Sequence, residues 1–443
     1  MRTLKIAAAL ALACGVSVAA ADWPQWRGPH GTGVTDEKNL PERWSATENV
    51  AWTAPIAGLG VSSPIVAGDR VFVTSQIGAG VRRPGTHPRL VQGGDPTAAG
   101  ERPLGAGREA PADGRTFFLV EAFNRRDGRR LWEHRFEAAG ELPGVHDKHN
   151  LATSSPVSDG QLVYAWFGTG QLVAIDMDGK LLWERHLGKE IAPFDIPWGH
   201  ASSPTLYGDL LILLCDHTPA SYLLAVDKRT GKERWKADRG KGRMSYTTPF
   251  VVDAATGPEL IVNSSERVDA YDPRTGAFLW HIGDTNRFPI PSPAFHNGIV
   301  YLTRGYRSGP YMAIRPGGRG NISTSHVVWG VPTGAPYVSS LVYDAGVIYM
   351  VSDVGGVVAI DAETGKRIWQ ERVDGIFSAS PVVGDGKVYF ASETGTTVVV
   401  KAGRQPAVIA TNDIGERLIA SPAISNGQIF LRGDGRLFCI GKR

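Results

Sequence analysis

Cysteine is scarce in this chain of 443 residues. Only Cys14, Cys215 and Cys439 are present, and no two of them are adjacent or spaced as in a C-x-x-C motif. Cys215 and Cys439 lie in apolar, strand-like runs in distant parts of the chain, so we predict two buried free thiols. A disulfide framework is excluded by the count.

The chain also lacks a strong net charge and long apolar segments. Its 47 Lys and Arg residues nearly balance its 44 Asp and Glu residues, the formal charge is +3, and no run of Lys or Arg forms a basic patch. Nucleic acid is therefore not an expected partner. Beyond the N-terminus no apolar run could span a bilayer. No feature predicts an oligomer, so we expect a monomer.

Common catalytic signatures are missing as well. The sequence contains no G-x-S-x-G elbow, no Walker sequence and no Rossmann fingerprint. These absences exclude the hydrolase and nucleotide-binding classes that depend on those motifs. Enzymes that use other residues remain open.

Residues 1–21 are predicted to be an export signal. Arg2 and Lys5 precede the apolar run IAAALALA, and the small residues VAAA lead to a cleavage position after Ala20 or Ala21. The alternative is lipidation of Cys14, whose neighbours loosely match a lipobox. Both interpretations place the protein in the periplasm or elsewhere in the bacterial cell envelope.

A repeated motif organises the rest of the chain. AIDAETGKRIW (359–369) recurs as AVDKRTGKERW (225–235) and AYDPRTGAFLW (270–280), with looser copies at 122–132 and 174–183. Alternating apolar residues, a turn with Gly and a short strand ending in Trp predict a β-hairpin. A fixed repeat of this kind is typical of a propeller or solenoid.

The tryptophan at the end of each hairpin is too large for one small sheet to bury. We therefore expect it to pack against the neighbouring repeat. The predicted docking residues are Trp52, Trp132, Trp183, Trp235, Trp280, Trp329 and Trp369.

Eight segments begin with a small-residue signature such as SSP, TTP or ASP, and each leads into an alternating strand. The last segment, which starts at Leu418, ends after three strands. The missing fourth strand matches NVAWTAPI (49–56) near the other end of the chain. We therefore predict an all-β fold: an eight-bladed β-propeller of four-stranded antiparallel blades, closed by an N-terminal strand.

Three segments depart from the repeat. Residues 22–47 are rich in Trp and Pro and are predicted to form an extended arm that packs on the propeller, which spans 48–443. Residues 78–115 are predicted to be a surface insertion in the first blade. The seventh blade, 377–414, contains no Trp, so its packing should differ from that of the others.

One rim of the propeller gathers histidine and aspartate. The loop after the second strand and the linker into the next blade emerge on the same face. We expect this rim to collect His146, Asp147, His149, Asp195, His200, Asp216 and His217.

Two interpretations of this rim are open. Imidazole and carboxylate groups suit a metal ion or an anionic ligand. Alternatively, these side chains hydrogen-bond the backbone of neighbouring blades, which the absence of a compact metal motif favours. The Ser and Thr residues of the segment starts could similarly line a polar channel, or be small because eight inner strands converge there.

The repeat A-x-D-x-x-T-G-x-x-x-W at Ala225, Asp227, Thr230, Gly231 and Trp235 resembles that of the pyrroloquinoline quinone (PQQ)-like β-propellers. The arm and the SSP signatures are similar to exported proteins of that superfamily. The resemblance covers nearly all of the chain beyond the signal, and it implies the fold more than the activity.

Two branches of this superfamily imply different functions. Quinoprotein dehydrogenases hold PQQ with calcium and carry two adjacent cysteines, which this chain lacks. The branch of the outer-membrane assembly factor BamB resembles this chain in its eight simple blades and consists of scaffolds. We therefore predict a non-catalytic scaffold that binds an envelope protein or small ligand at the rim. The alternative is an oxidoreductase that uses PQQ with calcium, or a metal held by the rim.

Overall fold

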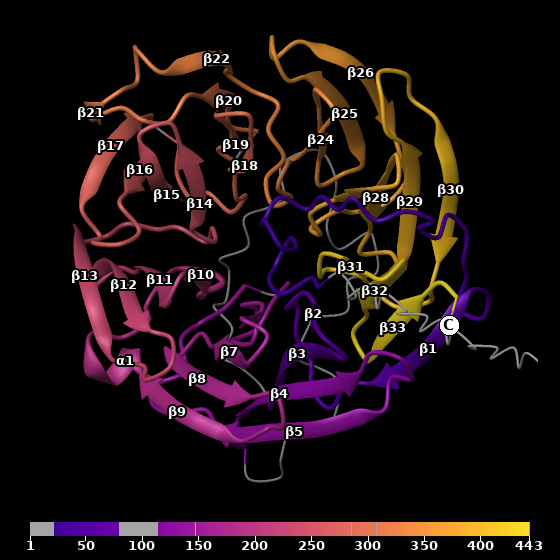
Figure 1. The fold of residues 1–443 in the computed structure, drawn as a ribbon, viewed down its shortest axis with the longest axis horizontal. Helices are drawn as coiled ribbons and strands as arrows, with labels where there is room; N and C mark the ends of the chain where they lie inside the picture. Colours follow the sequence, from indigo (N-terminus) through magenta and orange to yellow (C-terminus); the bar gives the residue numbers. More distant parts are fainter. Residues whose placement is uncertain (1–21, 79–113, 147, 285, 307, 443) are drawn as a thin grey trace, which may run out of the picture.

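Eight antiparallel sheets surround a central axis and form a closed ring (Figure 1). This computed structural model describes residues 22–78, 114–146, 148–284, 286–306 and 308–442. The predicted export signal with Cys14, most of the predicted insertion, and Asp147 lie outside the described residues. The prediction of an eight-bladed propeller is confirmed.

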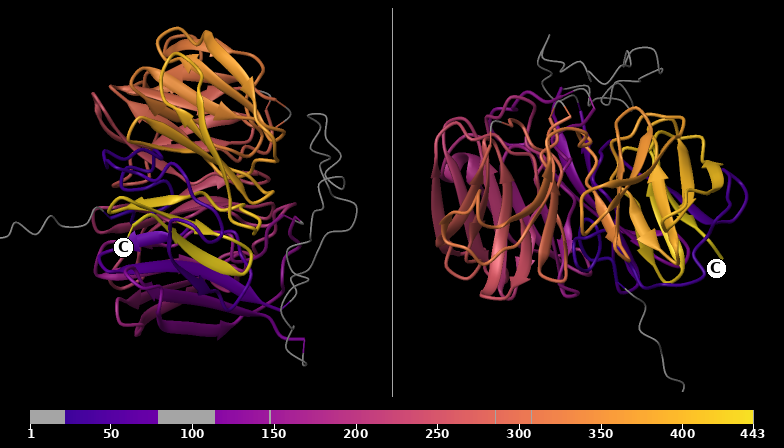
Figure 2. Two further views of the ribbon diagram at one scale, coloured as in Figure 1. Left: turned by 90° about the vertical axis from the view of Figure 1, so that its right-hand side faces the viewer. Right: turned by 90° about the horizontal axis from the view of Figure 1, so that it is seen from above.

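Each blade runs from an inner to an outer strand, and the blades stand side by side around the ring (Figure 2). The first four blades are β2(Ile65–Ala67)-β3(Arg70–Ile77)-β4(Phe117–Asn124)-β5(Arg130–Glu137), β6(Val157–Ser158)-β7(Leu162–Trp166)-β8(Gln171–Asp176)-β9(Leu181–His186), β10(Thr205–Tyr207)-β11(Leu210–Asp216)-β12(Ser221–Asp227)-β13(Glu233–Gly240) and β14(Phe250–Ala254)-β15(Gly257–Ser264)-β16(Arg267–Tyr271)-β17(Phe278–Gly283).

The other four blades follow in the same order. They are β18(Ala294–His296)-β19(Ile299–Thr303)-β20(Tyr311–Ile314)-β22(Val327–Val331), β23(Val342–Asp344)-β24(Val347–Val351)-β25(Gly356–Asp361)-β26(Arg367–Arg372), β27(Val382–Gly384)-β28(Lys387–Ala391)-β29(Thr396–Lys401)-β30(Val408–Asp413) and β31(Ala423–Ser425)-β32(Gln428–Arg432)-β33(Arg436–Ile440)-β1(Val50–Pro55).

Burial explains the difference between the middle and outer strands. Every residue of β11 is buried, because both faces of a middle strand pack against neighbouring blades. The outer strand β13 has exposed residues along most of its length. The only helix among the described residues is α1 (Leu187–Glu190), and no helix there is long and apolar enough to cross a membrane.

The ring is closed as the sequence predicts. β1 pairs antiparallel with β33, with Thr53 opposite Phe438. Trp52 on β1 donates its Nε1–H to the Arg125 carbonyl of the first blade at 2.8 Å. The N-terminal strand therefore joins the last blade to the first and leaves no unpaired edge at the seam.

The docking tryptophans contact the glycine turn of the next blade. A Cβ atom added to Gly128 would lie 2.5 Å from the Trp52 ring, and Gly128 has φ +73°, so a side chain cannot replace this glycine without strain. Six of the seven predicted docking residues donate Nε1–H to a carbonyl of the following blade, namely Trp52, Trp132, Trp183, Trp235, Trp329 and Trp369.

Trp280 is the exception. Its Nε1 donates to Glu259 Oε2 within its own blade at 2.7 Å. Its backbone pairs in parallel with β21 (Gly320–Asn321), which comes from the lengthened hairpin of the fifth blade. This hairpin, rather than a glycine turn, lies against the fourth blade.

The arm provides a tryptophan to the blade that has none. In the seventh blade Ala410 occupies the position opposite Val399 where other blades have Trp. Trp44 from the arm belongs to the same apolar cluster as Ala410 and stacks on Tyr389, with ring centroids 6.4 Å apart. In the second blade the corresponding pair, Tyr164 and Trp183, has a centroid distance of 6.2 Å.

Trp44→Ala is therefore expected to lower the free energy of unfolding by about 3 kcal/mol, because it removes a large buried ring from a core cluster. Urea unfolding followed by circular dichroism measures the change. Arg43→Ala is the matched control in the same arm, since Arg43 makes one exposed hydrogen bond to Ile409. Equal stability of the two variants would show that Trp44 does not take the place of the docking tryptophan that the seventh blade lacks.

A closed ring of hydroxyl groups surrounds the central axis. In each blade one Ser or Thr at the start of the inner strand accepts a hydrogen bond, of 2.9–3.1 Å, from the backbone N–H of its counterpart one blade away. We call this set the hydroxyl ring; it consists of Ser63, Ser155, Ser203, Thr248, Ser292, Ser340, Ser380 and Ser421. These eight bonds tie all blades together at the axis.

The arm crosses one end of this axis. Trp23 pairs with Val66 in the first blade, and Val34 pairs with Val383 in the seventh. Between these points Arg27 is buried and donates to the carbonyls of Ser292, Pro293 and Leu341. Burial lowers the pKa of Arg27 to about 9. The arm is therefore anchored across this end of the axis.

Candidate functional site

A cavity of about 200 Å³ lies in the channel between the hydroxyl ring and the linkers that join the blades. We call it the mouth cavity. Six members of the hydroxyl ring line this cavity, and the side chain of Trp26 from the arm also lines it. Its outer wall consists of residues from the linkers between blades, chiefly His146, Lys148, His149, Trp198, Tyr246 and Tyr337.

The first two linkers are tied together at Trp198. The Trp198 carbonyl accepts hydrogen bonds from the His146 backbone N–H at 3.1 Å and from His149 Nε2 at 2.6 Å. Burial lowers the pKa of His149, so its imidazole is neutral at pH 7 and carries the Nε2 proton. His149 therefore positions the Trp198 backbone.

Aromatic side chains continue around the mouth from Trp198. Its ring centroid lies 6.1 Å from that of Tyr246 and 4.5 Å from that of Phe288, which is edge-on at 87°. Phe288 contacts Tyr306 at 5.1 Å, and Tyr306 contacts Tyr337 at 5.6 Å. These five residues form the aromatic arc.

The backbone of the aromatic arc is strained at one point. Phe288 has φ +57°, a left-handed conformation that disfavours a bulky side chain and costs on the order of 1–2 kcal/mol. Such strain persists where surrounding contacts hold it, and it clusters at binding sites. Here it places the Phe288 ring against Trp198.

The charged groups at the mouth are paired. Lys148 Nζ lies 3.0 Å from Glu393 Oε1, and both side chains are largely buried. Ser378 Oγ donates to the same carboxylate oxygen. Within the part of the chain that the structure describes, the mouth therefore presents little net charge to a ligand.

Asp353 lies behind Tyr337. Its Oδ2 accepts the Tyr337 backbone N–H at 3.1 Å, whereas its Oδ1 is buried without a hydrogen-bond partner among the described residues. Burial raises the pKa of Asp353 to about 6. Its carboxylate is thus destabilised at neutral pH by desolvation.

Asp353→Asn is expected to stabilise the protein at pH 8 by about 2–3 kcal/mol and to have little effect at pH 4. Because the native pKa is raised, the native state binds the proton more tightly than the unfolded state between about pH 4 and 6, so stability falls as pH rises through that window. Urea unfolding of both proteins at several pH values measures the difference. A difference in the free energy of unfolding that does not change with pH would refute the raised pKa of Asp353.

The predicted rim residues fall into separate groups. His146 and His149 stack in parallel at 6.4 Å beside the mouth cavity. His200 and His217 are buried with Trp166 and Phe194, and His217 Nε2 lies 3.4 Å from His200 Nδ1. Asp195 is exposed on its linker.

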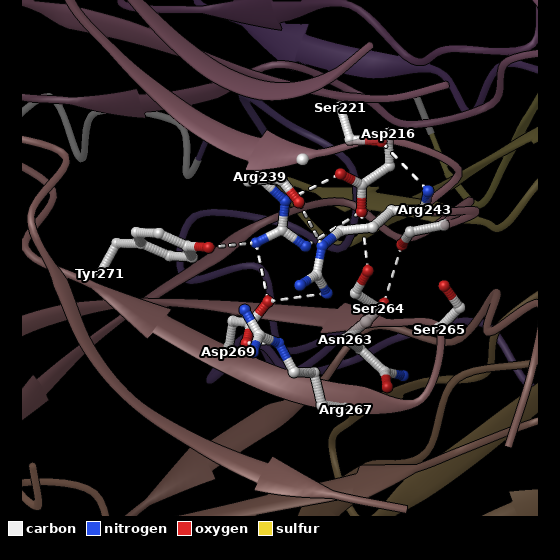
Figure 3. A network of polar contacts seen from close by, with 12 residues as sticks. Asp216, Ser221, Arg239, Arg243, Asn263, Ser264, Ser265, Arg267, Asp269 and Tyr271 are labelled. Carbon is white, nitrogen blue, oxygen red and sulfur yellow. Dashed lines mark hydrogen bonds and ion pairs between the residues drawn. The ribbon is translucent and has the colours of Figure 1, made fainter. Parts of the chain in front are cut away.

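Asp216 belongs to a buried ionic network (Figure 3). Arg239 donates Nε and Nη2 to its two oxygens at 2.8 and 3.0 Å, and Ser264 donates to Oδ2 at 2.7 Å. Arg239 also bonds Asp269 and the Tyr271 hydroxyl. Asp216 is therefore occupied in joining the third blade to the fourth.

Among the described residues no three His, Cys, Asp or Glu side chains gather closely enough to hold a metal ion. His149 bonds the backbone of a neighbouring linker, as the alternative interpretation expects. His200 instead bonds the Ser202 carbonyl two residues further on, and Asp216 bonds side chains of the third and fourth blades. Cys215 and Cys439 are buried free thiols, as predicted.

The described residues at the mouth do not fit PQQ with calcium. PQQ carries three carboxylates, whereas the one Lys or Arg in the described lining of the cavity is Lys148, which is already paired with Glu393. The described residues provide no acidic cluster for calcium. The whole chain has no adjacent cysteines.

Comparison with protein families relates most of the chain to a known family. The family described as outer membrane protein assembly factor BamB matches residues 116–304 and 321–405, which is more than half of the chain. The crystal structure of BamB from Moraxella catarrhalis superposes with a TM-score of 0.52 at 17% identity, over 73% of this chain and 89% of that one. This likeness concerns the fold.

Curated relatives include enzymes. Tetrathionate hydrolase of Acidithiobacillus ferrooxidans is 28% identical over 295 residues, which cover 62% of this chain and 54% of that protein. Polyvinylalcohol dehydrogenase of Pseudomonas sp is 25% identical over 404 residues, which cover 78% of this chain and 59% of that protein. The chain thus spans little more than half the length of these relatives.

Proposed function

Because this chain belongs to the family of the outer membrane protein assembly factor BamB, we propose that it is an exported, non-catalytic binding module of the bacterial cell envelope. The binding face is the rim around the mouth cavity. It takes an envelope protein or a small ligand.

The observation that carries this proposal is the state of the polar side chains at the mouth. Lys148 is paired with Glu393, and His149 is held by Trp198. Both ring nitrogens of His149 and the Lys148 ammonium group therefore have partners within the protein. What the cavity offers instead is aromatic surface and hydroxyl groups, which are the elements of a recognition site.

Rigidity supports the same proposal. The hydroxyl ring ties the blades at the axis, the arm is anchored across one end of the axis, and the last blade is joined to the first at the seam. A scaffold that keeps its binding surface in one shape loses little conformational entropy when a partner binds.

Site-specific crosslinking in native cells tests the proposal. A photoreactive residue is placed at Asp195, which is exposed on the rim, and in a matched strain at Val408, which is exposed on an outer strand. We expect a discrete crosslinked partner or ligand from the rim position and none from the control. The same products from both positions, or a protein that remains in the cytoplasm, would contradict the proposal.

The second candidate function is an oxidoreductase that uses PQQ or a metal. In its favour is the alignment of polyvinylalcohol dehydrogenase with 78% of this chain. Incubation of the purified protein with PQQ and calcium, followed by absorbance and dye-reduction assays with alcohols, separates the two. Reduction of the dye would replace the binding-module proposal with this one.

A further inference from the structure

We propose that the mouth cavity binds one ring of a neutral saccharide. The inference rests on the proposed function and names the ligand class of the same site. It combines four properties of the cavity: an aromatic wall, a floor of hydroxyl groups, paired charges and a small volume.

The aromatic wall suits the apolar face of a sugar ring. Trp198, Tyr246 and Tyr337 all line the cavity, and they come from three different linkers. Phe288 and Tyr306 connect them from behind, so their positions are fixed before a ligand arrives. Such large, rigid rings provide contact area at a low cost in conformational entropy.

The floor provides hydrogen-bonding groups in an unusual arrangement. Ser63, Ser155 and Ser203 line the cavity and each accepts a backbone N–H. Among the described residues their hydroxyl hydrogens have no acceptor in the protein, and each oxygen keeps a second lone pair. A ligand with several hydroxyl groups could satisfy them, whereas a purely apolar ligand would leave them unpaired.

Charge and size narrow the ligand further. The Lys148 ammonium group is neutralised by Glu393, and no other Lys, Arg, Asp or Glu lines the cavity among the described residues. An anionic ligand would therefore have to break a largely buried ion pair. The cavity of about 200 Å³ suits a single ring, with any further units of a chain lying outside the mouth.

The test uses the mature protein and an array of neutral and acidic mono- and oligosaccharides, including N-acetylglucosamine, chitobiose, cellobiose and galacturonate. The best binder is then titrated by calorimetry. We expect at least one neutral saccharide to bind. Its acidic counterpart should bind at least tenfold more weakly. Trp198→Ala should weaken binding at least tenfold, and Trp198→Phe by about three- to tenfold.

Phe278→Ala is the matched control, because Phe278 is an exposed aromatic residue on outer strand β17. Its affinity should stay within twofold of the wild type. The Trp198→Phe variant keeps an aromatic ring, so it preserves the test if Trp198→Ala fails to fold. Sugar binding that is the same in the Trp198 and Phe278 variants would overturn the inference.

The outcomes also separate this inference from the proposed function. If no neutral saccharide binds but the rim crosslink at Asp195 is intact, the ligand class is wrong and the binding module stands. If a planar aromatic such as menadione binds instead with the same dependence on Trp198, the inference is likewise overturned. If a bound sugar is converted to product, the ligand class stands and the non-catalytic proposal is wrong.

Discussion

Replacing Arg239 with leucine is expected to lower the free energy of unfolding by about 3–5 kcal/mol. Arg239 is fully buried and pairs with Asp216 through two hydrogen bonds and with Asp269 through a third. The substitution leaves the Asp216 carboxylate in the interior without its counter-charge, whereas Asp269 keeps Arg267 at 2.6 Å. Removing one partner of a buried ion pair typically costs this much, because the remaining charge is uncompensated.

Arg274→Leu is the matched control. Arg274 also makes a two-bond contact with an aspartate, Asp272, but its side chain is exposed. Exposed pairs contribute little, so we expect unchanged stability. Urea unfolding of both variants is the measurement. If the Arg239 variant were as stable as the control, the network in Figure 3 would not hold the third and fourth blades together.

Acidification is expected to destabilise the protein through buried histidines. Burial lowers the pKa of His217 from about 6.5 to about 3, and burial followed by the neighbouring His217 lowers that of His200. Between about pH 6.5 and pH 3, His217 binds a proton in the unfolded state but not in the folded state. The stabilising contribution of the neutral His217 is therefore fully present above about pH 6.5 and is lost as the pH falls toward 3. At pH 4.5 the loss from His217 alone is about 3 kcal/mol.

The variant His217→Leu isolates this contribution from that of the carboxylates. Leucine does not titrate, so the difference in stability between wild type and variant should shrink by about 3 kcal/mol between pH 7 and 4.5. Urea unfolding at the two pH values measures it. A difference that is the same at both would mean that His217 is protonated in the folded state.

The fold could be predicted because its determinants recur. The hairpin ending in Trp appears several times with Gly at the same place, and each Gly is required by the ring that lies on it. The missing last strand identified β1 as the closing strand. Local sequence patterns of this kind are sufficient to predict a fold in which every blade has the same strands and turns.

The contribution of Trp44 could not be predicted in the same way. The absence of Trp from the seventh blade indicated altered packing there, but Trp44 is far away in sequence. Its stacking on Tyr389 depends on the path of the arm, which the repeat does not specify. Contacts made by an irregular segment leave no period in the sequence.

The site was predicted only in outline. The linkers that carry His146 and His200 were identified from their composition, but burial divides their side chains between the cavity wall and the core. The aromatic arc was missed. One signal was available, since Tyr246 and Tyr337 each stand one or two residues before the small-residue signature of a blade. That position places a side chain at the channel mouth.

The binding-module proposal is tested most directly by analysing the protein purified from its native envelope. Elemental mass spectrometry and an absorbance spectrum determine whether it carries a metal ion or a quinone. We expect neither in stoichiometric amount, because Lys148 and Glu393, the charged pair described at the mouth, already neutralise each other. One equivalent of a bound metal, or the absorbance of a quinone, would contradict the proposal and make the oxidoreductase the better interpretation.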